Sequence, residues 1–122
     1  MRLANDYVPT PTVSYNVKKL GAAGGVMVTS SHNPWNWNGV KFKAKFGGSA
    51  TPAIMKSIED ELVADTVPSG RAAKIPAAKI EEVDLKPAYV EAVTQFADLD
   101  LIRRADFKFA IDSMYGSGRR CV

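Results

Sequence analysis

The stretch that decides the fold class reads Gly24-Gly25-Val26-Met27-Val28-Thr29-Ser30-Ser31-His32-Asn33-Pro34. In it, a short apolar run is followed by a polar loop. The three apolar residues that follow the glycines are typical of a strand buried on both faces. Pro34 ends the polar loop, because proline does not fit a central strand. Open α/β sheets place their sites in loops that follow buried strands. This stretch therefore predicts an α/β fold with a functional loop at residues 29–34.

The next segment, residues 40–46, alternates in the manner of a half-exposed strand. Apolar side chains occupy its even positions, and its odd positions carry Lys41, Lys43 and Lys45. We expect the lysines to face solvent and the apolar side chains to face the core. Asn38-Gly39 is a strong turn signal between this strand and the loop.

Prolines and glycines mark the expected helices on both sides of this unit. Thr12 is a candidate N-cap for a helix that ends at Gly21, and Thr51-Pro52 is expected to start a second helix. Pro87 is expected to open a third helix. Residues 107–111 read Phe-Lys-Phe-Ala-Ile, and this alternation predicts a further strand.

Length and composition limit the domain organisation. The chain has 122 residues, of which 46% are hydrophobic and 24% charged, as in an ordinary globular protein. A strand and a glycine-rich turn near the C-terminus leave no room for a helix that would cover the sheet. We therefore expect an excised portion of a longer protein. It divides into part of a first domain at residues 1–66, a connecting segment at 67–86 and the start of a second domain at 87–122.

Charge and cysteine content narrow the class of protein. The formal net charge of +3 is smaller than the concentrated basic charge of most nucleic-acid binders. No apolar run approaches the roughly 20 residues of a membrane span, and the N-terminus lacks the apolar core of a signal peptide. A single cysteine, Cys121, and a single histidine, His32, exclude an internal disulfide and a His/Cys zinc site. We expect a cytoplasmic protein without a membrane partner.

Residues 29–41 hold most of the reactive groups. They combine hydroxyl, imidazole, amide and ammonium groups and contain no carboxylate, a pattern that suits an anion such as phosphate. A serine hydrolase is disfavoured because the G-x-S-x-G elbow is missing and the side chains of the neighbours Ser31 and His32 are expected to diverge. From the residues alone, a polar turn whose serines cap nearby amides is favoured over a catalytic loop.

This loop resembles the active-site loop of the α-D-phosphohexomutases, the phosphoglucomutase and phosphomannomutase enzymes. The residues that carry the resemblance are 29–34 and the following Asn38-Gly39-Val40-Lys41. The family pattern is T-A-S-H-N-P, three variable residues and N-G-x-K, and this chain departs from it only at Ser30, which replaces alanine. With its flanks the resemblance covers nearly the whole chain. It implies an α/β fold, a mixed β-sheet with flanking helices. The fold would be the second half of the first phosphohexomutase domain plus the start of the second.

The same resemblance implies roles for individual residues. Ser31 matches the serine that carries phosphate in the resting enzyme and passes it to a hexose phosphate, which becomes a bound bisphosphate. The sugar reorients and returns its other phosphate, so that glucose or mannose phosphate is converted between its 1- and 6-forms. Lys41 lies beside the reacting oxygens as a catalytic and substrate-binding residue. His32 lines the catalytic site without being assigned as its base, and Asn33 is a candidate substrate ligand. Lys43 and Lys45 lack this support and are expected to be solvated.

The family also uses Mg²⁺, held by one oxygen of the serine phosphate and by three aspartates of the second domain. Here the phosphate would be on Ser31, and the Asp-Gly-Asp-Gly-Asp run is absent from the sequence. We therefore expect the longer enzyme to need Mg²⁺ and this piece alone to be inactive. Glucosamine phosphate is disfavoured as substrate, since Trp37 stands where those relatives usually carry Asp. Trp35 and Trp37 occupy variable positions, for which packing or simple exposure is preferred over sugar stacking.

Two alternatives remain open. The first is a small α/β module that binds anions or single-stranded nucleic acid without catalysis, because aromatic side chains interleave with the lysines of residues 41–45. Strand alternation explains the same pattern, so we expect no nucleic-acid partner. The second is a structural remnant with an exposed apolar edge that self-associates. The aromatic residues concerned are Trp35, Trp37, Phe42 and Phe46.

Overall fold

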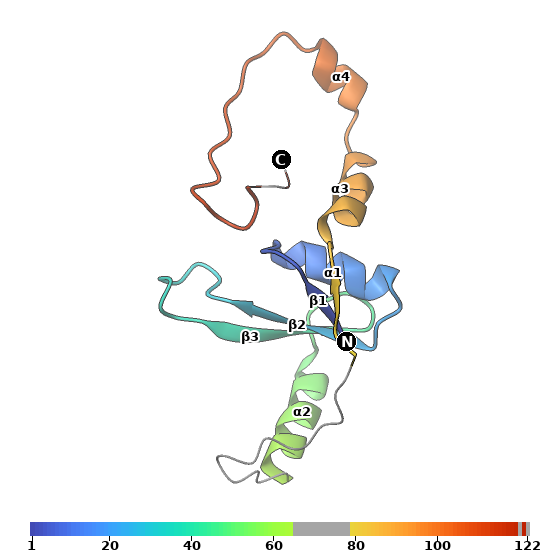
Figure 1. The fold of residues 1–122 in the computed structure, drawn as a ribbon, viewed down its shortest axis with the longest axis vertical. Coiled ribbons are helices and arrows are strands. Elements are labelled where there is room, and N and C mark those ends of the chain that lie inside the picture. Colours follow the sequence, from blue (N-terminus) through green and yellow to red (C-terminus); the bar gives the residue numbers. More distant parts are fainter. Residues whose placement is uncertain (65–78, 120, 122) are drawn as a thin grey trace.

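The computed structural model describes residues 1–64, 79–119 and 121 and has a mixed α/β architecture with two small sheets (Figure 1). The α/β class predicted from the sequence is confirmed. Helices and strands are interspersed along the described chain. None of the described helices is long and apolar enough to cross a bilayer. Their bounds are β1 (Arg2–Ala4), α1 (Thr10–Lys19), β2 (Gly24–Thr29), β3 (Gly39–Ala44), α2 (Pro52–Ala64), β4 (Glu81–Val83), α3 (Lys86–Thr94) and α4 (Leu99–Arg104).

Strands β2 and β3 form an antiparallel hairpin that carries the polar loop at its tip (Figure 1). The register runs from Gly24 opposite Ala44 to Thr29 opposite Gly39. Residues that pair across such a ladder project their side chains to the same face. Met27 and Lys41 therefore share one face of the hairpin.

Helix α1 packs on that face at Gly25. A Cβ atom added to Gly25 would lie 2.6 Å from Cγ2 of Val17, so the helix sits directly against the strand. Lys43 pairs with Gly25 and is drawn into this contact, where only 8% of it is exposed and its Nζ lies 3.5 Å from Ser49 Oγ. The prediction that Lys43 is solvated is wrong, because the register places it beneath α1. Lys45 lies beyond the strand end and is exposed, as expected.

The opposite face of the hairpin is largely uncovered. Val26, Val28 and Val40 on this face are 60%, 65% and 56% exposed. Among the described helices, α1 is the one that packs substantially on β2 and β3. The prediction that β2 is buried on both faces is therefore wrong, and so is the inward orientation expected for Val40. An apolar run reports the hydrophobicity of a strand, whereas its burial depends on a second element that covers it.

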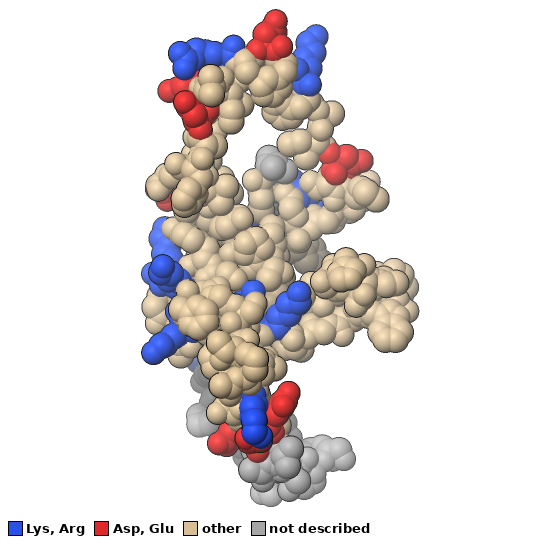
Figure 2. All heavy atoms as spheres, turned by 180° about the vertical axis from the view of Figure 1, so that it is seen from behind, with Lys and Arg blue, Asp and Glu red and all other residues tan. Residues whose placement is uncertain are grey.

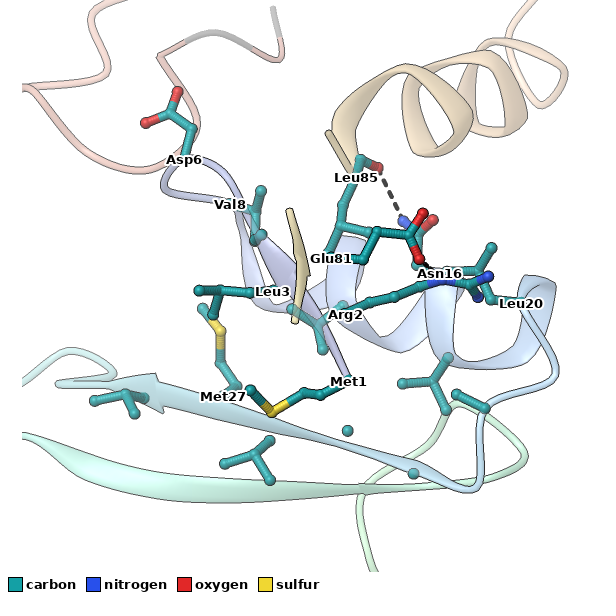
Figure 3. Close-up of a pocket in the computed structure, with 18 of the residues that line it drawn as sticks. Met1, Arg2, Leu3, Asp6, Val8, Asn16, Leu20, Met27, Glu81 and Leu85 are labelled. Atoms are coloured by element: carbon teal, nitrogen blue, oxygen red, sulfur yellow. Dashed lines mark hydrogen bonds and ion pairs between the residues drawn. The ribbon is translucent and has the colours of Figure 1, made fainter. Parts of the chain in front are cut away.

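Residues 79–94 pack against the start of the chain. Strand β4 pairs in parallel with β1, and α3 contacts α1. The buried Asn16 links them, because its Nδ2 donates to the carbonyl oxygens of Thr12 and Leu85, both at 2.9 Å (Figure 3). An ion pair between Lys86 and Asp6 adds to this contact. Strand β1 was not expected from the sequence, whereas β4 lies in the connecting segment, for which the sequence allowed one short extended piece. Since residues 65–78 lie outside the described part, the division at 67–86 stays a prediction.

Most of the expected helix boundaries are confirmed. Helix α2 begins at Pro52, and Thr51 Oγ1 accepts a hydrogen bond from the backbone N–H of Ile54 at 3.4 Å. Pro87 lies in the first turn of α3. Gly21 follows α1 with a φ of +58°, a left-handed conformation that suits glycine at a helix end.

Thr12 is not the N-cap of α1. The helix begins at Thr10 with Pro9 as its cap, and Thr12 lies inside the first turn. It is fully buried, and its Oγ1 has no partner in the described structure. Pro11 in the first turn explains the earlier start, because a proline there lacks only an N–H group that would be unsatisfied in any case.

The strand expected at residues 107–111 does not form. The segment forms neither helix nor strand, and it has no ladder partner among the described residues. Phe107, Phe109 and Ile111 are 56%, 70% and 60% exposed. Alternation predicts which side chains share a face, but a strand also needs a neighbour that accepts and donates its backbone hydrogen bonds. The preceding helix α4, capped by the side chain of Asp98, was not expected.

We predict that Gly25→Ala destabilises the fold by about 1–3 kcal/mol, because the new methyl group displaces the buried, β-branched Val17. Urea denaturation of the chain measures this loss. Gly118→Ala is the matched control, since a Cβ atom there meets nothing within 4 Å. Equal unfolding midpoints for the two variants would contradict the close contact between α1 and β2.

Candidate functional site

The candidate site is the loop at the tip of the hairpin, which projects from the body of the molecule (Figure 1). Thr29 and Gly39 form the last pair of the ladder, and residues 30–38 connect them. Two tight turns shape this loop. The backbone N–H of Asn33 donates to the carbonyl of Ser30, and that of Trp37 donates to the carbonyl of Pro34, both at 2.9 Å. Backbone hydrogen bonds thus hold the loop, whose side chains stay accessible.

Ser31 has an unusual backbone conformation at this tip. Its φ is +56°, in the left-handed region that residues other than glycine rarely adopt. Its backbone N–H donates to Oγ1 of Thr29 at 3.0 Å, which helps to hold the turn. Left-handed backbone at such a residue costs on the order of 1 kcal/mol and is enriched at functional sites. Nothing in the residue pattern of the loop indicates this conformation.

Ser31 and His32 are in contact through their side chains. Ser31 Oγ lies 3.2 Å from His32 Nδ1, and the tautomer of the imidazole decides which of the two donates. The expectation that these neighbours diverge is wrong, because the left-handed turn at Ser31 redirects its side chain relative to the next residue. Among the described residues no carboxylate bonds to the imidazole, so the acid that orients the histidine of a hydrolytic triad is lacking.

Lys41 lies near the base of the loop on the α1 face of the hairpin. It pairs with Met27 and is therefore diagonal to Thr29, at a separation of about 7–8 Å in such ladders. Gly39, which lies between them on β3, has no side chain to block the way toward the loop. Lys41 is exposed and makes no hydrogen bond or ion pair with the described residues. Its ammonium group is available to an anion.

The two asparagines of the motif differ in their contacts. The side-chain amide of Asn38 donates to the carbonyl of Trp35 at 3.4 Å and helps to shape the loop. The side chain of Asn33 is exposed and contacts no polar group of the described residues. It is accessible to a ligand, whereas its backbone N–H closes the first turn.

A hollow among the described residues lies beside this loop but does not include it. It has a volume of about 1010 Å³ and opens between β1, α1 and β2 (Figure 3). Met27 and Val28 line it, but none of residues 29–41 does. The candidate site is therefore an exposed surface loop next to an apolar hollow. Further lining residues include Met1, Leu3, Val8, Val17 and Leu85.

The described residues do not form a metal site by themselves. No group of three or more His, Cys, Asp or Glu side chains is clustered in residues 1–64, 79–119 and 121. The loop itself contains no carboxylate. The oxygen atoms that the loop offers are those of neutral hydroxyl, amide and backbone carbonyl groups.

The aromatic and basic side chains that interleave along β3 differ in their accessibility. Lys43 is buried beneath α1 and Phe42 is half-buried, so aromatic and basic side chains do not alternate along one accessible surface. A stacking groove requires such side chains to be exposed together.

Comparison with known proteins identifies the family. Residues 1–67 match the sequence model described as phosphoglucomutase/phosphomannomutase, alpha/beta/alpha domain I. The chain belongs to this family. The resemblance of its Ser-His-Asn-Pro loop to the phosphohexomutases is thereby confirmed.

Individual relatives agree with this assignment. The chain is 36% identical over 110 residues to the probable phosphoglucosamine mutase of Methanothermobacter thermautotrophicus, covering 90% of the chain and 23% of that protein. It is 29% identical over 133 residues to the phosphoglucomutase of Schizosaccharomyces pombe, covering 92% and 24%. The crystal structure of a putative phosphomannomutase from Thermus thermophilus superposes with a TM-score of 0.68 at 40% identity, over 81% of this chain and 21% of that one. The chain thus spans about a quarter of the length of these relatives.

We predict that Thr29→Val speeds solvent exchange of the Ser31 amide a few-fold, because the valine is isosteric but cannot accept its hydrogen bond. Thr29→Ser retains the hydroxyl and is expected to behave like the unchanged chain. Exchange NMR measures both. If valine and serine gave the same rate, the contact between Thr29 and Ser31 would not hold the turn.

Proposed function

We propose that this chain supplies the phosphoserine loop of a phosphohexomutase, which interconverts a hexose 1-phosphate and a hexose 6-phosphate. The observation that carries the proposal is the hairpin tip, where an exposed, strained Ser31 contacts His32 and Lys41 lies unpaired nearby. Membership of the family supports it. The resting form carries a phosphate on Ser31, which is a phosphoryl group stored on an otherwise weak nucleophile.

In the forward half-reaction, the phosphoryl group passes from Ser31 Oγ to a free hydroxyl of the bound hexose phosphate. The Oγ–P bond breaks, a new O–P bond forms on the sugar, and the product is a hexose bisphosphate with a free serine. The bisphosphate reorients, and its other phosphate is transferred back to Ser31. Such transfers depend mainly on positioning and on neutralising charge, and this loop offers donors and no carboxylate.

Lys41 is the cation for the transferred group. It lies on the same face of the hairpin as Thr29, separated from the loop by two ladder pairs, and its side chain is long and flexible. Asn33 contributes an exposed amide that can donate to a phosphate or sugar oxygen. Neutral amides and one ammonium group bind phosphate without competing negative charge.

His32 is the nearest acceptor for the hydroxyl proton of Ser31. Its Nδ1 lies 3.2 Å from Oγ, within reach for proton transfer when Ser31 attacks the bisphosphate. In the opposite direction, the protonated imidazole returns the proton to Oγ as the phosphoryl group leaves. His32 therefore acts on the serine, and Lys41 acts on the phosphate.

Mg²⁺ remains part of the proposal for the longer enzyme. A phosphate on Ser31 would provide one oxygen ligand, and the cation would neutralise charge on the transferred group. The remaining ligands have to come from outside this loop, since no acidic cluster is found in the described residues. We place the enzyme in the cytoplasm, in keeping with the single cysteine of this chain.

We assign the substrate to the class of hexose phosphates and not to one particular sugar. The sequence favours glucose or mannose over glucosamine, because Trp37 stands where the glucosamine-specific relatives usually carry Asp. Relatives named phosphoglucosamine mutase, phosphoglucomutase and phosphomannomutase are all similar to the chain. These names support a hexose phosphate without selecting one sugar.

We predict that protein isolated from its native source without phosphatase treatment carries one phosphate on Ser31. Trypsin releases the peptide Leu20 to Lys41, which contains Ser30 and Ser31 together, and fragmentation mass spectrometry localises the phosphate. Ser31→Ala is expected to abolish the modification, and Ser30→Ala is the matched control that retains it. Absence of phosphate, even after incubation with a hexose bisphosphate and Mg²⁺, would refute the proposed function.

We predict that Lys41→Gln in the longer enzyme slows phosphorylation of Ser31 by glucose 1,6-bisphosphate about a hundredfold, because a cation that stabilises the transferred phosphoryl group is lost. Rapid-quench mass spectrometry measures the rate. Lys45→Gln removes an exposed lysine beyond the end of β3 and should leave the rate unchanged. Equal rates for both variants would remove Lys41 from the site.

A further inference from the structure

Two tryptophans, Trp35 and Trp37, are exposed on the same loop that carries Ser31. Their exposed fractions are 87% and 67%, so neither side chain packs into the described structure. They are also the whole tryptophan content of the chain. Large aromatic side chains that stay in water in this way are common at binding surfaces.

The backbone between these residues is fixed by hydrogen bonds. The N–H of Trp37 donates to Pro34 O at 2.9 Å, and the amide of Asn38 donates to Trp35 O at 3.4 Å. Pro34 stiffens the start of the turn. Trp35 and Trp37 are therefore presented by an ordered turn, which lowers the conformational entropy lost when a ligand binds to their rings.

The surroundings of the pair favour a neutral ligand group with an apolar face. Residues 30–40 contain no Lys, Arg, Asp or Glu, and Figure 2 shows the projecting hairpin tip as an uncharged surface. The charged part of a sugar phosphate has its own partners in Lys41 and the donors around Ser31. What remains is the pyranose ring, which has C–H groups on its faces and hydroxyls at its edge. The face of an indole ring matches such a C–H face.

We propose that Trp35 and Trp37 form a binding surface for the pyranose ring of the hexose phosphate, while the phosphoryl group that is transferred lies between Ser31 and Lys41. The inference rests on the proposed function and extends it from the phosphate to the sugar. It gives the three variable positions of the motif a role in this chain. The pair contacts the sugar ring and takes no part in the transfer of the phosphoryl group.

Tryptophan fluorescence of the chain tests this directly, because all of its emission comes from this loop. Titration with glucose 1-phosphate is expected to shift or quench the emission in a saturable manner. Inorganic phosphate at equal ionic strength is expected to leave it unchanged. Trp35→Phe and Trp37→Phe each leave one indole as the sole reporter, so that the contribution of each ring is measured separately.

Binding affinities of the variants then decide the proposal. The double variant Trp35→Ala/Trp37→Ala is expected to bind glucose 1-phosphate at least about tenfold more weakly by calorimetry, and the double phenylalanine variant to retain most of the affinity. Circular dichroism checks the fold of each variant; the high exposure of both side chains predicts no change.

Failure of this proposal is distinguishable from failure of the proposed function. If the double alanine variant binds glucose 1-phosphate as tightly as the unchanged chain while Ser31 of the longer enzyme accepts phosphate, the tryptophan pair is not a sugar surface and the mutase function stands. An emission that responds equally to inorganic phosphate, or to neither compound, would also overturn the sugar contact. If Ser31 never accepts phosphate, the proposed function itself falls.

Discussion

The antiparallel pairing of β2 with β3 is the constraint on which the site depends. It brings Thr29 and Lys41, twelve positions apart in the sequence, into diagonal positions of one ladder face. A slip of one residue would move Lys41 to the opposite face, away from the hydroxyl that holds Ser31 in its turn. The hairpin register therefore determines whether the serine and the lysine can act on the same phosphate.

The two faces of this hairpin are packed unequally. One face is covered by α1, whereas the other exposes apolar side chains that could associate with another surface. On one face α1 approaches so closely that β2 has glycine at the contact. On the other face Val26, Val28 and Val40 remain in water. Exposed apolar strand surface of this kind favours association with another element. Self-association therefore stays a prediction. The surface that would mediate it is the face of the hairpin opposite Lys41.

The sequence allowed much of the local structure to be predicted, because the signals concerned act over a few residues. Pro52 and Gly21 mark helix ends through their own backbone geometry, and the Ser-His-Asn-Pro loop was located by its motif. The failures involve partners that are distant in the sequence. Burial of Lys43 depends on α1, the pairing of β1 depends on residues 81–83, and the strand expected at 107–111 lacks a neighbour among the described residues. Local alternation cannot report whether such partners are present.

The contact between Ser31 and His32 shows the same limit within the site itself. Adjacent side chains normally diverge, and the sequence contains no indication that Ser31 takes a positive φ. Once that turn forms, the hydroxyl and the imidazole meet, and the strain of the backbone is offset in part by the hydrogen bond to Thr29. In the proposed mechanism, a serine held in this way needs little reorganisation before it reacts, so a surface loop without a deep pocket can order its reactive groups. The remaining demand on the site is to hold the sugar, and the exposed tryptophans stand on the same ordered loop.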